Sequence, residues 1–402
     1  MHLPSYLDPR ALLNRLFSTY WFVPTIVTAI LVVLAFVLTA IDTGGGSDGS
    51  WLQWLLYHGN ADGAQSLLTA VAGSTITVVS VTYSMMVVAL TVSSQHFGPR
   101  LLNNFMRDTA AQVVLGTFVG TFAYCLVVLR SVYSADGEGE QGYVPALATT
   151  GAVALTLVSI GALIYYVHHV ATSMQVSEIT AGVARDLERT VDRIYPQPIG
   201  DEPDPEVAEP PEVPADAVPL RACDSGYLQE VSDDALLRLA EHHDVVVWLQ
   251  VRPGDFVVEG DAFAYVAPAP GDDFGARLWQ ALIVGADRTS YQDAAFCVQQ
   301  LVEVALRGLS PGVNEPFTTL TAIDRLGQGL ARLAARQPPA PVRVDEQRRP
   351  RVITRPRTLA DLLAPAFEPI ALHAGRNPAI GERLLVALRL LASRARRPED
   401  LA

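Results

Sequence analysis

Four long apolar runs near the start of the chain limit what it can fold into. They cover residues 21–41, 73–92, 111–129 and 146–167, and none contains an acidic residue, a lysine or an arginine. A helix needs ~20 mainly apolar residues to cross the hydrocarbon core of a bilayer, and each run is about that long. The sequence therefore predicts an integral membrane protein with four transmembrane helices, in a domain of residues 1–172.

The loop charges predict an orientation. Arginines precede the first run, separate the second run from the third and follow the fourth, whereas the two remaining loops are acidic. Because positive loops stay in the cytoplasm, we expect a multi-pass protein with cytoplasmic N- and C-termini. The bias toward arginine and alanine points to a GC-rich bacterial genome, hence to the bacterial plasma (inner) membrane. The first run is longer than the core of a signal peptide, which favours an uncleaved span.

The rest of the chain predicts an α+β cytoplasmic region. Residues 173–195 have the spacing of an amphipathic stalk helix, which could pack against its copies in an oligomer. An acidic, proline-rich linker of residues 196–219 cannot bury a core. A small β-rich module of residues 220–270 and a mainly helical domain of residues 271–402 follow. The fold class is thus an α-helical membrane protein whose four transmembrane helices precede a β-module and a helical domain.

Local signals place the elements of these last two domains. We expect a helix over residues 233–243 with Ser232 as its cap, then strands within 244–251, 256–259 and 262–267. Further along, a helix over 291–308 ends at a Ser-Pro-Gly break, and Asn314 with Pro316 would cap the next helix. Residues 342–344 and 351–354 could pair as a hairpin. Two helices, over 358–374 and 377–396, would close the chain.

Composition excludes several classes of function. The net charge of −13 without a basic binding motif argues against nucleic-acid binding. The chain contains no lysine, which excludes lysine Schiff-base chemistry, the P-loop lysine and lipoyl or biotinyl attachment. Its three cysteines, Cys125, Cys223 and Cys297, have neither metal-ligand spacing nor a disulfide pattern. We find no catalytic signature, so we expect no enzyme activity, no metal and no cofactor.

The second apolar run has a polar face. Hydroxyl and small residues recur there at steps of four and three, which places them on one side of a helix. The candidates to line a hydrated pore are Thr77, Ser80, Ser84, Thr91 and Ser94. Two interpretations stay open: a permeation path, where hydroxyls replace part of an ion's hydration, or close packing between helices.

The third run carries a G-x-x-x-G arrangement at Gly116 and Gly120. Such pairs let two helices approach closely. The pattern predicts a packing notch and does not say whether the neighbour belongs to the same subunit.

Polar residues are densest in the expected helical domain. The candidates to bind a ligand or a partner are Arg288, Asp293, Glu303, Arg307 and Asn314. Glu303 and Arg307 are four residues apart, the spacing of a stabilising pair on a helix. The alternative is a purely structural role, as the ion pairs and caps of a helical bundle.

Several of these stretches resemble a bacterial family of predicted multi-pass membrane proteins, a domain-of-unknown-function family. In the membrane domain the resemblance rests on residues 88–90, 93–95, 97–100, 104–108 and 112–118, and at the end of the fourth run on residues 164–173. In the helical domain it rests on residues 287–289, 292–293, 305–307 and 309–318. The resemblance extends over nearly the whole chain. It implies the architecture and no activity.

Two hypotheses of function follow. The first is a homo-oligomeric channel or permeation pathway in the lipid bilayer with a cytoplasmic regulatory domain, because one face of the second run bears hydroxyls and no run contains a charge. The second is a membrane-anchored sensor or scaffold, whose cytoplasmic domain binds an ion, a small molecule or a protein. Flux through the protein would distinguish the first from the second.

Overall fold

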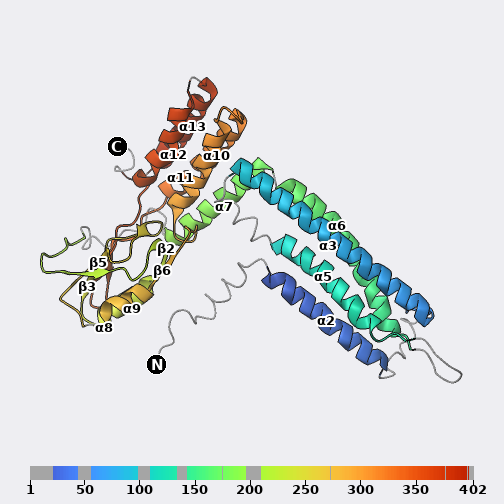
Figure 1. Cartoon of the computed structure of the whole chain (residues 1–402). Coiled ribbons are helices and arrows are strands. Elements are labelled where there is room, and N and C mark those ends of the chain that lie inside the picture. Colours follow the sequence, from blue (N-terminus) through green and yellow to red (C-terminus); the bar gives the residue numbers. More distant parts are fainter. Residues whose placement is uncertain are drawn as a thin grey trace. The chain divides into compact units, whose positions relative to one another are not determined.

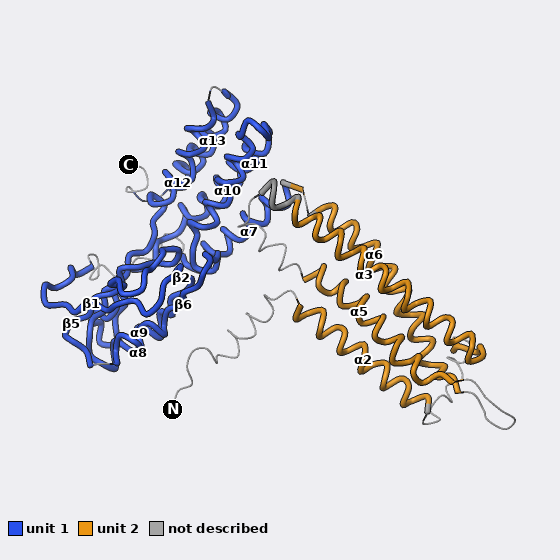
Figure 2. The backbone as a smooth tube through the Cα atoms, viewed as in Figure 1, with its two compact units in different colours: residues 1–5, 176–402 blue, residues 6–175 orange. Residues whose placement is uncertain are grey.

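In this computed structural model the chain forms two separately packed units (Figure 2). One contains residues 6–175, and the main part of the other begins at residue 176. We call them the membrane unit and the C-terminal unit. The structure describes residues 21–43, 56–97, 109–133, 143–173, 175–195, 210–271, 273–375, 377–395 and 397.

Four helices form the membrane unit (Figure 1), and all four are long and apolar enough to cross a membrane. They are α2 (Phe22–Thr43), α3 (Ala61–Phe97), α5 (Thr109–Leu129) and α6 (Ala146–Ser173). The four predicted spans are confirmed, although α3 begins twelve residues before the predicted run. Helix α5 lies at the centre of the unit: half of its apolar window is buried, against 6% for α2.

Glycines set the contact between α2 and α5. A Cβ on Gly116 would lie 2.9 Å from the Cα of Pro24, and one on Gly120 would lie 3.2 Å from the Cα of Thr28. Side chains at these positions would therefore collide with the backbone of α2. The G-x-x-x-G notch is filled by a helix of the same subunit, which settles the question that the sequence left open.

A carboxylate joins the end of α2 to the start of α6. Asp42 accepts hydrogen bonds from the backbone amides of Leu147, at 3.0 Å, and Ala148, at 3.1 Å. Helix N-termini present unpaired N–H groups and a positive partial charge, so an acidic side chain stabilises them. Deeper in the unit, the hydroxyls of Thr121 and Ser159 lie 3.1 Å apart between α5 and α6.

The C-terminal unit contains two sheets. One has five strands in the order β1-β5-β3-β8-β7, and the other has three in the order β4-β2-β6. Their bounds are β1 Val218–Arg221, β2 Gly226–Val231, β3 Val246–Leu249, β4 Phe256–Val257, β5 Ala262–Ala267, β6 Leu282–Gly285, β7 Val342–Val344 and β8 Pro350–Ile353. The predicted hairpin is confirmed, since β7 and β8 are antiparallel. Strand β8 also pairs in parallel with β3, about a hundred residues earlier in the chain.

Both sheets contribute to one apolar core. It includes Leu228 of β2 and Phe263 of β5, and two short helices close it, α8 (Asp233–His242) and α9 (Phe274–Gln280). On the opposite face of the five-stranded sheet, Trp248 packs with Val342 and Ile353. The β-module predicted for residues 220–270 thus shares its larger sheet with a hairpin from the following segment.

Five helices complete the C-terminal unit: α7 (Val176–Ile194), α10 (Ala294–Gly308), α11 (Pro316–Ala334), α12 (Ala360–His373) and α13 (Pro378–Arg394). The amphipathic helix predicted as a stalk is α7. Its apolar side is fully buried at Val183, Leu187 and Val191, and it packs against α10 and α11 of its own chain. A Cβ on Gly329 of α11 would lie 2.3 Å from a methyl group of Leu187, so this glycine permits the close packing.

Two predicted helix starts are wrong. Helix α10 begins at Ala294 and not at residue 291, because the Asp293 side chain accepts a hydrogen bond from the Phe296 amide and caps it. Asn314 does not cap α11: its φ is +50°, and Glu315 occupies the cap position before Pro316. Asparagine tolerates this left-handed conformation, so its role is in the turn. Asn377 does cap α13, through the Ala379 amide.

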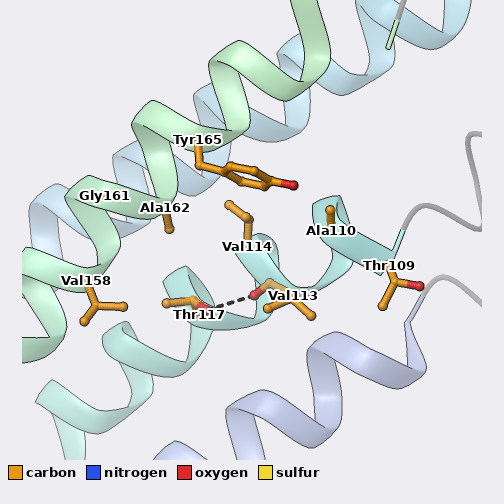
Figure 3. Close-up of a pocket in the computed structure, with 9 residues that line it drawn as sticks. All are labelled: Thr109, Ala110, Val113, Val114, Thr117, Val158, Gly161, Ala162 and Tyr165. Carbon is orange, nitrogen blue, oxygen red and sulfur yellow. Dashed lines mark hydrogen bonds between the residues drawn. The ribbon is translucent and has the colours of Figure 1, made fainter. Parts of the chain in front are cut away.

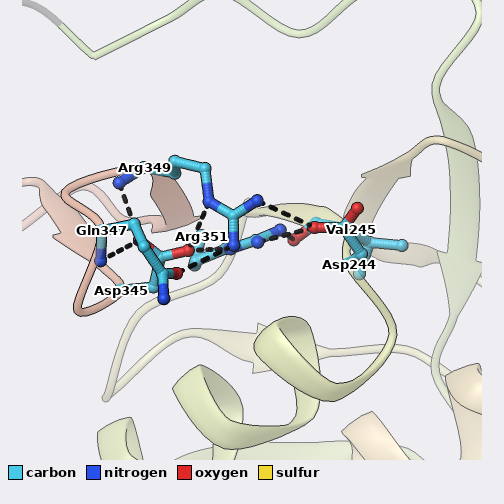
Figure 4. A network of polar contacts seen from close by, with 6 residues as sticks. All are labelled: Asp244, Val245, Asp345, Gln347, Arg349 and Arg351. Atoms are coloured by element: carbon cyan, nitrogen blue, oxygen red, sulfur yellow. Dashed lines mark hydrogen bonds and ion pairs between the residues drawn. The ribbon is translucent and has the colours of Figure 1, made fainter.

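A polar network fixes the hairpin beside β3 (Figure 4). The Arg351 guanidinium of β8 donates to Asp345 at 2.9 Å and to Asp244, just before β3, at 2.6 Å. Burial raises the pKa of Asp345, but hydrogen bonds from the Arg349 amide and from the Arg351 and Arg349 guanidiniums lower it to about 2. Arg351 thus stays paired at neutral pH and anchors a strand that is remote in sequence.

Candidate functional site

The hydroxyl stripe of α3 lies on the outside of the membrane unit. Thr77, Ser80, Ser84 and Thr91 are all exposed, and no atom lies within 4 Å of a Cβ built on Gly73, in line with them. The side of α3 that packs in the unit is the opposite one, with Ala64, Leu68, Thr75, Thr82 and Ala89 buried. Ser94 lies in α3 among residues whose side chains are outside the described set.

Packing within the subunit therefore does not explain the stripe. Of the two interpretations left open by the sequence, close helix packing requires a neighbour outside this chain, because no described helix of the subunit covers these residues. Large apolar side chains are exposed on α3 as well, at Ile76, Val81 and Val88. Phe36 of α2 and Ile164 of α6 are exposed in the same way, as expected for contact with lipid.

The hydroxyls of the stripe bond to their own helix. Thr77 donates to the carbonyl of Gly73 at 2.9 Å, Ser84 to that of Ser80 at 2.9 Å, and Thr91 to that of Val87 at 2.8 Å. The hydroxyl proton is used, but each oxygen keeps lone pairs that can accept a hydrogen bond or approach a cation. The stripe thus offers a row of oxygen acceptors along one apolar helix.

A shallow groove lies on another side of the membrane unit, between α5 and α6 (Figure 3). Its volume is about 540 Å³. Its walls are mostly apolar. They are formed by Thr109, Ala110, Val113, Val114, Thr117, Val158, Gly161, Ala162 and Tyr165. The Thr117 hydroxyl bonds back to the Val113 carbonyl at 2.9 Å. The small residues Gly161 and Ala162 leave room for this groove. None of the described residues that line it is a predicted pore residue.

In the C-terminal unit, Arg288 and Asp293 form a buried ion pair. Two guanidinium nitrogens of Arg288 donate to one Asp293 oxygen, at 2.6 and 2.8 Å, and a third donates to Gln299 at 2.8 Å. The other Asp293 oxygen caps α10. Asp293 is 1% exposed and Arg288 17%. Burial raises the pKa of Asp293, and the Arg288 guanidinium opposes that shift.

The backbone around this pair is held from several sides. Gly254, with φ +95°, sits so close that a Cβ would lie 2.2 Å from the Asp293 carboxylate. Gln292 pairs with both backbone groups of Val231 in β2, at 2.8 and 3.1 Å. From α7, Arg193 donates to the Tyr291 carbonyl at 2.8 Å. Residues 287–293 therefore join α7 and α10 to the three-stranded sheet and to the turn at Gly254, and Arg288 and Asp293 satisfy each other.

The five predicted ligand residues do not converge. Arg288 and Asp293 meet at the start of α10, whereas Glu303 and Arg307 lie half-buried further along it. At 1.5 Å per residue, Arg307 is ~20 Å along the axis from Asp293. Asn314 lies in the turn after the helix. The set thus separates into three places that no single small ligand could span. Arg288 and Asp293, with Gly254 and Gln292 beside them, form a buried cluster that we call the hub. Glu303 and Arg307 lie further along α10, and Asn314 lies beyond its end.

No sequence signal identifies Gly254 as part of this hub. Pro253-Gly254-Asp255 is a typical turn sequence, but the buried pair that Gly254 contacts lies some forty residues away in sequence. Only the positive φ and the short carboxylate approach identify its role. Among the described residues, no group of three or more histidine, cysteine, aspartate or glutamate side chains could hold a metal ion.

Comparison with known proteins finds one family over nearly the whole chain. The family model described as Predicted membrane protein (DUF2254) matches residues 18–390. The uncharacterized proteins Rv1290c of Mycobacterium tuberculosis and Mb1321c of Mycobacterium bovis are each 37% identical over 344 residues, which is 84% of this chain. The chain spans 64% of the length of these curated relatives. No solved structure matches it.

Proposed function

The chain belongs to the DUF2254 family of predicted membrane proteins, and from that premise we propose that it forms a homo-oligomeric permeation pathway lined by the hydroxyl stripe of α3. The observation that carries the proposal is the position of the stripe. The stripe is exposed on the side of α3 opposite the packed side. The stripes of several copies can therefore face one another around a common symmetry axis.

Chemistry supports a path for an ion or a small polar solute. A row of hydroxyl oxygens in an uncharged span can replace part of a hydration shell without trapping the solute. The described parts of all four spans lack lysine, arginine and glutamate, and their two aspartates lie at helix ends. Asp42 is at the end of α2, where it caps α6, and Asp62 is in the first turn of α3. Such a span lacks the groups that charge-coupled transporters use.

The sensor or scaffold hypothesis has less support. It is motivated in part by the candidate ligand or partner residues Arg288, Asp293, Glu303, Arg307 and Asn314. Arg288 and Asp293 instead satisfy each other, and the remaining three lie elsewhere. The C-terminal unit then acts on the pathway as a regulatory domain.

We expect Ser84→Leu to block permeation. Leucine at the middle of the stripe removes a hydroxyl and narrows the pore that the copies would form around their common axis. Ion flux into liposomes containing the full-length protein should fall at least about tenfold, which is about 1.4 kcal/mol in barrier height. The flux is measured with a panel of monovalent cations and anions under an imposed gradient.

Met85→Leu is the matched control. Met85 is exposed one residue away, at the same depth, but about 100° around the helix and off the stripe. It should leave flux within about twofold, less than about 0.5 kcal/mol. Wild-type flux no greater than that of empty liposomes would refute the pathway, and so would a Ser84→Leu protein that conducts like wild type.

The loop charges support cytoplasmic termini, which cysteine labelling tests. In a Cys223→Ser background, Gly46→Cys should react with an impermeant maleimide on intact spheroplasts, because residue 46 lies in an acidic loop. Asp204→Cys should react only after the membrane is opened. The reverse pattern would invert the orientation. Both positions lie outside the described residues.

A further inference from the structure

The described part of the chain leaves the outward side of α13 uncovered, and two large apolar residues lie at the centre of that side. Ile380, Leu384, Ala387 and Leu391 are buried within the C-terminal unit, where α13 packs on α11. At the centre of the outward side, Leu385 is 55% exposed and Val386 52%. Leu388 and Leu390, about 200° apart around the helix, lie at its two edges, and Leu390 lines a groove with residues of α7 and α11. Large apolar residues exposed together in this way are typical of a contact with another molecule.

Two opposite charges also lie on this outward side. Glu382 and Arg389 are both exposed and two helical turns apart, with Leu385 between them on the same face. In the described part of the chain neither forms an ion pair, whereas their neighbour Arg383 contacts Asp324 of α11 at 3.2 Å. The two charges are ~10.5 Å apart along the axis and equidistant from a point between Leu385 and Val386.

We propose that α13 pairs antiparallel with α13 of a second copy of this chain, about a twofold axis between Leu385 and Val386. That symmetry brings Glu382 beside the partner's Arg389 and, by the same operation, Arg389 beside the partner's Glu382. Leu385 and Val386 of each copy fill the space between the two ion pairs. The interface is self-complementary in charge and in hydrophobicity.

A second copy fits this surface better than a lipid surface does. Lipid headgroups favour a cluster of basic residues, whereas here one acid and one base stand symmetrically about an apolar centre. One pair of helices is a small interface. Two copies held in one bilayer have a high effective concentration, so weak contacts suffice. The proposal concerns the C-terminal unit and does not depend on permeation.

Disulfide trapping tests the pairing in the full-length protein in its membrane. In a Cys223→Ser background the remaining cysteines, Cys125 and Cys297, are buried. With Leu385→Cys, mild oxidation should give a covalent dimer on non-reducing gels. Ala379→Cys is the control: it is also exposed on α13, but about ten ångströms along the axis from the twofold centre. It should give little dimer.

Charge reversal then tests the ion pairs. Glu382→Arg or Arg389→Glu alone would place like charges together and should lower the Leu385→Cys dimer yield about fivefold. The double variant restores opposite charges and should recover the yield. Single variants with unchanged yield, a double variant no better than either, or Leu385→Cys trapped only with a different protein would each overturn the proposal. Protection of Cys297 from thiol reagents confirms folding in every variant.

Discussion

Asp293→Ala is expected to destabilise the C-terminal unit more than any other single substitution considered. It leaves the Arg288 guanidinium, 17% exposed, without its carboxylate and removes the cap of α10. Breaking one side of a buried ion pair costs about 3–5 kcal/mol, and losing a cap costs about 1 kcal/mol in other proteins. The melting temperature of the unit should fall by roughly 10 °C.

A native thiol measures this loss within the full chain. Cys297 lies on α10, is fully buried and belongs to the C-terminal unit. In a Cys125→Ala, Cys223→Ser background it is the only thiol, so its reaction with a fluorogenic maleimide during heating reports unfolding of that unit.

Two further variants sharpen the interpretation. Asp293→Asn keeps an oxygen to cap α10 but loses the charge, and should give an intermediate loss. Arg189→Ala breaks the exposed pair with Asp186 and should cost less than about 1 kcal/mol. If Asp293→Ala melts within about 2 °C of its parent, less than about 1 kcal/mol, the pair does not hold the unit together.

Gly116→Ala is expected to loosen the membrane unit. The new Cβ would lie 2.9 Å from the Pro24 backbone, so α2 must shift away from α5. Overpacking of this kind costs about 1–3 kcal/mol, against a gain of up to ~1 kcal/mol in helix propensity. Cys125, buried on the same helix, reports unfolding in a Cys223→Ser, Cys297→Ala background.

Gly161→Ala is the matched control for this substitution. Gly161 also lies within a membrane helix, α6, but no atom lies within 4 Å of a Cβ built there. It should keep or slightly raise the melting temperature measured at Cys125. Equal effects of the two substitutions would mean that the notch does not set the distance between α2 and α5.

Periodicity predicted the elements well and their neighbours poorly. The four apolar runs predict spans because length and hydropathy are local properties. The first twelve residues of α3 were missed, since Asp62 and Gln65 interrupt the apolar run while the backbone hydrogen bonds continue. The stripe on α3 follows from spacing, but only the fold shows that it lies opposite the packed side. Spacing tells which residues share a face and not what that face meets.

The hub around Asp293 shows the same limit. Asp293, an acidic residue three positions before Phe296, is a standard cap signal. The helical spacing nevertheless continues back to Tyr291, so the sequence predicts a helix that starts too early. Pairing with Arg288 and contact with Gly254 depend on how a turn and a loop meet in space. Glu303 and Arg307, one turn apart on α10, looked equally promising by composition, and nothing local distinguished them from the hub.

The position of β8 has a consequence for synthesis at the ribosome. Strands β1, β5 and β3 can pair as soon as residue 267 has emerged, but β3 then has an open edge beside it. Its neighbour β8 is translated some eighty residues later, after α10 and α11. During that interval the nascent chain exposes backbone groups that invite pairing with other strands. A stop codon or a translational pause between the two would therefore leave a sheet prone to aggregation.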